Sequence, residues 1–143
     1  MAVARPVSAE EATKLTKVGD WEIWRSINPM SDRVQCTAFY KDDTTVQLTN
    51  HNLAFDVSHN GGLVTYAVRY DDGQATEVFA SERLKNIGAV ILAGTDFDDV
   101  KSAKRLRIRI GTLVNGYLDY DLNLSMLTPV MEILSGKSCI NPS

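Results

Sequence analysis

Hydrophobic and polar residues alternate with a period of two along much of the chain, which is the pattern of β-strands that bury one face. The first strand begins at Trp21, and further strands are predicted at residues 34–40, 45–49, 53–57, 63–70 and 75–79. Turn-forming residues such as Asp71-Asp72-Gly73 separate them. Short strands at this regular spacing predict a mainly β domain, either an antiparallel β-sandwich or a barrel-like fold.

The clearest alternation predicts a hairpin near the end of the chain. Its charged residues, which alternate with apolar ones, are Arg105, Arg107, Arg109, Asp119 and Asp121. A two-residue Asn-Gly loop would set Arg109 against an apolar side chain. A three-residue loop over residues 114–116, with its glycine left-handed, instead places Arg109 opposite Asp121. We therefore expect the longer loop, because it matches both faces and charges across the hairpin.

The beginning of the chain carries a local helix pattern. Ser8 and Glu11 have the spacing of a capping box, and Gly19 is suited to end a helix. Residues 1–19 are therefore predicted to form an N-terminal arm with a helical segment. Residues 20–143 are predicted to form one mainly β domain, because no linker-like stretch divides them.

Other short helices are predicted in the second half of the chain. Residues 81–86 suit one helical turn, and residues 96–104 have the acidic start and basic end of a surface helix. Residues 89–92 fit either a buried strand or the end of a helix. Thr128 is expected to cap a short C-terminal helix that runs to Ser135.

Size and charge narrow the functional classes. The 143 residues suit one domain with an ordinary core. The net charge of −3 removes the overall attraction to a phosphate backbone, so we expect no nucleic-acid partner. Apolar runs are much shorter than the roughly 20 residues of a membrane-spanning helix. Residues 1–6 lack the features of a secretory signal, so the protein is expected to be cytoplasmic, or exported with its signal removed.

Cys36 and Cys139 are the two cysteines of the chain. One lies in a predicted strand and the other beyond the C-terminal helix. A bond between them would close a loop of about one hundred residues and stabilise the fold by about 4 kcal/mol in the chain-entropy model. The alternative is a buried structural thiol and an exposed thiol near the C-terminus. The residues alone leave both interpretations open.

Catalytic and metal-binding motifs are not found. The sequence contains no Gly-rich phosphate loop, nucleophile elbow or His-Glu-x-x-His helix. His51 and His59 lack a third ligand at metal-site spacing. Asp96, Asp98 and Asp99 lack the pattern of a calcium loop and suit the start of a helix. We therefore predict a non-enzymatic protein without a metal or cofactor.

Two surface features are candidates for binding a partner. Trp21 and Trp24 fall on opposite faces of one strand, so Trp24 is a candidate exposed contact. Arg105, Arg107 and Arg109 project to one side of a strand and, together with Lys101 and Lys104, are a candidate basic stripe for phosphate or an acidic partner. The alternative for this stripe is a solvated strand face that the aspartates of the next strand partly neutralise.

Two segments resemble a known bacterial family. Residues 19–23 (Gly-Asp-Trp-Glu-Ile) and, after a turn, 34–38 (Val-Gln-Cys-Thr-Ala) are similar to the invasion-associated locus B proteins of Gram-negative bacteria. Residues 122–139, a strand leading into a helix and a cysteine, are also similar. The resemblance implies a secreted or periplasmic β-sandwich without an assigned activity, linked to host-cell invasion or envelope function. That family usually has a further cysteine where this chain has Trp24 and Arg25.

Two functional hypotheses follow. The leading one is a non-enzymatic module, periplasmic or secreted, that is stabilised by a Cys36–Cys139 disulfide and binds a protein or a glycan. The contrasting one is a cytoplasmic regulator or inhibitor whose cysteines stay reduced. In that hypothesis, Arg105, Arg107 and Arg109 dock on an acidic partner.

Overall fold

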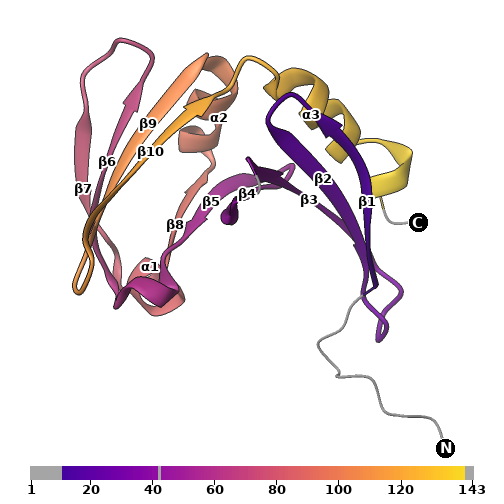
Figure 1. Ribbon diagram of the computed structural model, residues 1–143, viewed down its shortest axis with the longest axis horizontal. Helices are drawn as coiled ribbons and strands as arrows, with labels where there is room; N and C mark the ends of the chain where they lie inside the picture. The colour runs from indigo at the N-terminus through magenta and orange to yellow at the C-terminus, as the bar shows by residue number, and fades with distance from the viewer. Residues whose placement is uncertain (1–10, 42, 141–143) are drawn as a thin grey trace, which may run out of the picture.

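The protein is a β-sandwich of two antiparallel sheets (Figure 1), as a computed structural model that describes residues 11–41 and 43–140 shows. The first sheet has six strands in the order β1 (Glu11–Val18), β2 (Trp21–Ile27), β3 (Val34–Tyr40), β4 (Asp43–Leu48), β5 (Asn52–Asp56) and β8 (Ala89–Ala93). The second has four, in the order β10 (Gly116–Asn123), β9 (Arg105–Thr112), β6 (Leu63–Tyr70) and β7 (Thr76–Phe79). The predicted sandwich is confirmed, and β3 and β6 have the predicted bounds.

Short helices connect and flank the sheets. They are α1 (Glu82–Ile87), α2 (Thr95–Ser102) and α3 (Leu127–Leu134), with 3-10 turns at Ser58–Asn60 and Lys137–Cys139. The helices predicted in the second half of the chain are confirmed, and the ambiguous residues 89–92 form a strand. In the part of the chain that the structure describes, no helix has the length and hydrophobicity needed to cross a membrane.

The C-terminal helix α3 is confirmed, but its start differs from the prediction. The residue at its N-cap is Met126, which makes no side-chain capping bond, and Thr128 lies inside the first turn. Leu127 is buried and its backbone N–H donates to the carbonyl of Leu124. Burial of Leu127 therefore begins the helix before the residue that was expected to cap it.

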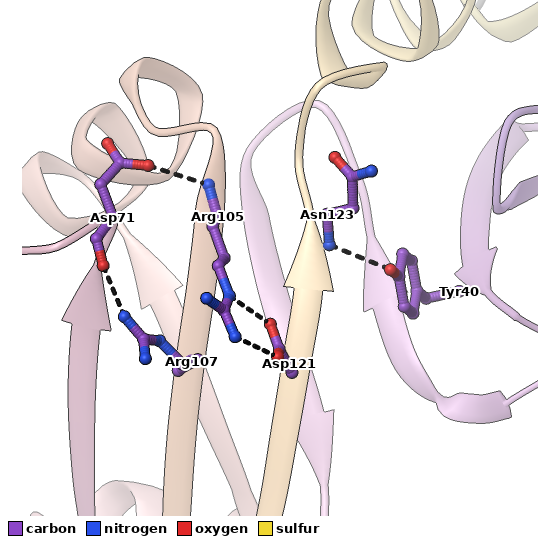
Figure 2. Close-up of polar contacts among 6 residues, drawn as sticks. All are labelled: Tyr40, Asp71, Arg105, Arg107, Asp121 and Asn123. Carbon is purple, nitrogen blue, oxygen red and sulfur yellow. Dashed lines mark hydrogen bonds and ion pairs between the residues drawn. The ribbon is translucent and has the colours of Figure 1, made fainter.

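Aromatic contacts pack both within the six-stranded sheet and between the two sheets. Trp21 is 1% exposed and its ring packs edge-on against Tyr40, with centroids 4.9 Å apart. Phe55 of the six-stranded sheet lies 5.1 Å from Tyr120 of the four-stranded sheet, centroid to centroid. The backbone N–H of Asn123 donates to the Tyr40 hydroxyl over 3.0 Å (Figure 2). Both apolar burial and this polar bridge hold the sheets together.

A disulfide between Cys36 and Cys139 connects β3 to the turn that follows α3. The two Cα atoms lie 5.4 Å apart, and 103 residues separate the cysteines along the chain. The backbone carbonyl of Ser138 also accepts a bond from Arg25 Nε at 2.8 Å. The segment after α3 is thus held against the six-stranded sheet by one covalent bond and one hydrogen bond.

The helix predicted in the N-terminal arm is wrong for the residues that the structure describes. Residues 11–18 form β1, which pairs antiparallel with β2, whereas Ser8 lies outside the described residues. Gly19 has a φ of +57° and begins a tight two-residue turn, so that Val18 pairs with Trp21. The glycine that was expected to stop a helix therefore turns a hairpin, which suits its tolerance of positive φ.

The register of the last hairpin differs from the prediction by two residues. Gly116 is left-handed as expected, with a φ of +64°, but it pairs with Thr112, and the loop is residues 113–115. The Thr112 hydroxyl explains the shift, because it donates to the Gly116 carbonyl and accepts from the backbone N–H of Asn115. The shift by two keeps the predicted faces but pairs Arg109 with Asp119.

We predict that removing the disulfide destabilises the domain. The variant Cys36→Ala/Cys139→Ala should lose about 4 kcal/mol of unfolding free energy, because its unfolded chain regains the entropy of a long open loop. Urea denaturation of both proteins measures the difference. Reductant should lower the stability of the natural protein and leave the variant unchanged. A difference below about 1 kcal/mol would contradict the prediction.

Candidate functional site

The three predicted arginines lie on the outer face of the four-stranded sheet. The apolar residues that alternate with them along β9 are at most 2% exposed, so the arginines face away from the core. We call this surface the arginine face. It comprises the outward residues of β10, β9, β6 and β7, which are Tyr117, Asp119, Asp121, Asn123, Arg105, Arg107, Arg109, Gly111, Thr65, Ala67, Arg69, Glu77 and Phe79.

Trp24 lies on the opposite side of the molecule. It is on the outer face of the six-stranded sheet, because its neighbour Ile23 points into the core. Its indole Nε1 donates to Glu22 over 2.6 Å, and Lys14 lies 3.4 Å from the other carboxylate oxygen of Glu22. The bond from Trp24, more than the charge of Lys14, lowers the pKa of Glu22. Trp24 is half-buried in this cluster, so the structure does not join it to the arginines.

Two of the three arginines form ion pairs with the neighbouring strand. Arg105 donates to both oxygens of Asp121, with distances of 2.9 and 2.6 Å (Figure 2). Arg109 does the same with Asp119, at 2.7 and 3.0 Å. These hydrogen bonds raise the pKa of each guanidinium and lower the pKa of each carboxyl group. The predicted pairing of Arg109 with Asp121 is therefore wrong, because the hairpin register is shifted by two residues.

Arg107 has a different environment. Its Nη2 donates to the backbone carbonyl of Asp71 over 2.8 Å (Figure 2), and its buried Nε has no hydrogen-bond partner. Arg69 pairs with Arg107 across β6 and β9, and its Nε donates to the carbonyl of Gly73 over 2.7 Å. Within the described residues, neither guanidinium has a carboxylate at ion-pair distance. The β6–β7 turn therefore orients two adjacent cations without neutralising them.

Asp71 fixes that turn to the start of β9. Its side-chain Oδ1 accepts the backbone N–H groups of Lys104 and Arg105, at 2.9 and 3.0 Å, and its own N–H donates to the Arg105 carbonyl. Asp71 also has a φ of +51°, a conformation that aspartate tolerates better than most residues. The Asp71 carboxylate thus accepts hydrogen bonds from the backbone at the start of β9, while the Asp71 backbone carbonyl accepts the bond from Arg107.

An open groove of about 620 Å³ runs over the arginine face. Its lining residues are Ala67, Arg69, Ala75, Glu77, Arg107, Ile108, Arg109, Asp119, Tyr120 and Asp121. Three arginines face three acids here, but Asp121 is neutralised by Arg105 from just outside the lining. The groove therefore combines carboxylate acceptors with guanidinium donors and keeps a local excess of positive charge.

An aromatic row borders the charged residues. In register across the sheet, Tyr117 lies beside Gly111, then Thr65, then Phe79. Tyr117 is 69% and Phe79 is 78% exposed. A Cβ on Gly111 would lie 2.8 Å from Thr65 Oγ1, which is too close, and 3.5 Å from the Tyr117 ring, which is ordinary contact, so Thr65 is the neighbour that requires glycine here. The row therefore offers two exposed aromatic rings with small residues between them.

A second cavity, of about 490 Å³, lies beside the disulfide on the six-stranded sheet. It is lined mainly by polar side chains, including His51 and Gln35. His59 lies in a 3-10 turn and is not among its lining residues. Within residues 11–41 and 43–140, no three His, Cys, Asp or Glu residues gather where they could hold a metal ion.

The local sequence pattern identified the arginines of β9 but not Arg69, Glu77, Phe79 or Tyr117. Arg69 does alternate with the apolar residues of 63–70, so its outward direction was readable. Which strand would lie beside it was not, because β6 and β9 are almost forty residues apart along the chain. Long-range pairing, rather than a local motif, assembles the groove.

Comparison with protein-family models, with curated proteins and with solved structures finds no match to this chain. The resemblance to the invasion-associated locus B proteins is therefore neither supported nor contradicted, and it stays a prediction.

We predict that the two ion pairs can be separated by titration. Replacing Arg109 in Arg109→Gln should return the pKa of Asp119 toward the ordinary 3.8 and leave Asp121 unchanged. Arg105→Gln should have the converse effect. Carboxyl-carbon NMR during an acid titration measures both groups. A shift of Asp121 in Arg109→Gln would contradict the observed register.

We predict that the stabilising effect of the same two ion pairs depends on pH. Both carboxyl groups have lowered pKa values in the folded protein, so their stabilising effect is complete above the unfolded pKa. It is lost as the pH falls through the folded pKa values.

Proposed function

We propose that the protein is an exported, non-enzymatic binding module that binds a glycan on the arginine face. One observation carries this proposal: a groove with fixed carboxylate and guanidinium groups lies directly beside two exposed aromatic rings. Sugars present hydroxyls on their edges and apolar C–H groups on their faces. Such a surface matches both parts of a sugar ring.

The fixed charges suit hydroxyl recognition. A hydroxyl both donates and accepts, so it can bond a carboxylate and a guanidinium at the same time. Arg109 and Asp119 already hold each other through two bonds, which limits the conformational entropy lost when a ligand binds. Arg109 also lies 5.2 Å from the centre of the Tyr117 ring. This contact links the charged part of the groove to the aromatic row.

The contrasting hypothesis, docking of an acidic partner through Arg105, Arg107 and Arg109, has less support. Arg105 and Arg109 are already paired with aspartates, and an acidic partner would have to compete with those carboxylates. Glu77 would also repel an acidic partner. Most polar groups of a glycan are neutral hydroxyls, which meet no such repulsion, so the acids favour a glycan over a protein surface rich in carboxylates.

Export is supported by the disulfide. Disulfides persist in the periplasm and outside cells and are rare in reducing cytoplasm. The structure joins Cys36 to Cys139 at a Cα distance of 5.4 Å without displacing β3 from its sheet. In this proposal the module works in the cell envelope or at a host-cell surface, as the resemblance to the invasion-associated locus B proteins implies.

We predict that both cysteines are oxidised in protein purified from its native compartment. Alkylation under denaturing conditions, followed by intact-mass analysis, should label neither thiol until reductant is added. The labelled mass after reduction provides the control. Immediate labelling of both cysteines would support the cytoplasmic alternative and remove the main argument for export.

We predict that the aromatic row contributes to glycan affinity. Binding is first screened with a panel of glycans, which should contain peptidoglycan fragments, lipopolysaccharide core oligosaccharides and mammalian cell-surface glycans. For the glycan that the natural protein binds, Tyr117→Ala and Phe79→Ala should each weaken affinity up to about tenfold, because each removes an aromatic contact. Calorimetry or surface plasmon resonance measures the change.

The matched control is Met30→Ala, which removes an apolar side chain that is 86% exposed in the turn before β3. Its affinity should equal that of the natural protein. Equal losses in all three variants would contradict a role for the arginine face. Failure of the natural protein to bind any member of the panel would contradict the proposed ligand class.

A further inference from the structure

Two like charges lie side by side at the centre of the arginine face. Arg69 and Arg107 are directly paired in register on β6 and β9. Like charges directly opposite one another on a sheet destabilise it. The fold nevertheless positions both, through the carbonyls of Gly73 and Asp71 in the same turn. Among the described residues, neither cation has a carboxylate at ion-pair distance, so this oriented pair favours binding of an external anion.

The carboxylates near Arg69 and Arg107 are either bonded to another arginine or lie in a neighbouring row of the sheet. Asp121 is opposite Arg107 in register, yet both of its oxygens accept bonds from Arg105. The charge of Arg107 still helps to lower the pKa of Asp121, after the larger effect of the Arg105 hydrogen bonds. Glu77 lies one row away, opposite Ala67. Asp121 is therefore shared by Arg105 and Arg107, while Arg69 has no carboxylate at ion-pair distance among the described residues.

Arg107 is also incompletely hydrogen-bonded. Its Nε is buried and has no partner, which is uncommon because a buried donor without an acceptor costs stability. Its Nη2 bonds to a neutral carbonyl rather than to a carboxylate. Both Arg107 and Arg69 line the groove, so their remaining N–H groups are close to any ligand there.

We propose that Arg69 and Arg107 form an oxyanion subsite for the acidic group of the glycan, either a carboxylate or a sulfate ester. This inference rests on the proposed function, because the anion is carried by the sugar. Guanidinium groups bind such oxyanions through paired, charge-assisted hydrogen bonds. An oxyanion between Arg69 and Arg107 would relieve their mutual repulsion, while Asp119 and Glu77 would accept bonds from the sugar hydroxyls.

The subsite is tested on the folded protein by NMR of arginine Nε–H groups. The probes are sodium glucuronate, sodium sulfate and, as the neutral control, glucose. Glucuronate or sulfate should shift the Arg69 and Arg107 signals along a saturable curve, and glucose should not. The relative affinities of glucuronate and sulfate distinguish a carboxylated from a sulfated sugar. Arg83, exposed on α1, is the internal control and should not shift.

Charge-preserving variants test the geometry. Arg69→Lys and Arg107→Lys keep the positive charge but lose the planar guanidinium, so each should weaken binding of the preferred anion about tenfold. Arg83→Lys should leave that affinity unchanged. Shifts of equal size at Arg83, or full affinity in both lysine variants, would overturn the subsite because they indicate unspecific charge attraction.

The outcomes separate this inference from the proposed function. If neutral glycans bind and neither anion does, the subsite is wrong and the binding module stands. If the anions bind at Arg69 and Arg107 but no glycan does, the subsite stands and the proposed function is wrong. Stronger binding of an acidic oligosaccharide than of its neutral counterpart, lost in Arg107→Lys, supports both.

Discussion

The candidate site depends on the pairing of β6 with β9. Each of these strands belongs to its own hairpin, β6 with β7 and β9 with β10, and their pairing makes one four-stranded sheet of the two. It brings Arg69 beside Arg107 and sets Thr65 beside Gly111. Asp71 strengthens the join at one end, because its side chain and backbone together accept or donate four hydrogen bonds to residues 104–107. The groove, the aromatic row and the Arg69–Arg107 pair all depend on this pairing of β6 with β9.

The charge arrangement on that sheet shows how a basic strand is partly neutralised. Three arginines alternate along β9, but only two aspartates face them on β10. The aspartates pair with Arg105 and Arg109, and Arg107 is left between them with a backbone carbonyl. Solvent-exposed pairs of this kind contribute little to stability. Their two-bond geometry does orient four side chains on this face of the sheet.

The sequence predicted the strands better than their partners. Alternation located β3 and β6 because one face of each is buried, and that burial leaves a periodic trace. For residues 11–18, a capping pattern and Gly19 suggested a helix. These residues instead form a strand that pairs with the edge of β2. The hairpin prediction also placed Arg109 two residues out of register, because the hydrogen bonds of the Thr112 hydroxyl that determine the loop leave no periodic pattern in the sequence. Local pattern therefore predicts faces, while register and long-range pairing depend on contacts between distant residues.

The cystine has a consequence for how the molecule withstands proteolysis. Cys36 lies in the third strand and Cys139 after the last helix, so every turn from β4 onward to α3 lies within the loop that they close. The loop between β9 and β10 exposes Leu113 and Val114, each by 73%. A protease that cuts there releases no fragment, because the two pieces of the chain remain covalently joined through the sulfur atoms. A single cut leaves one molecule with two polypeptides, still held in the same sandwich by its buried inner faces.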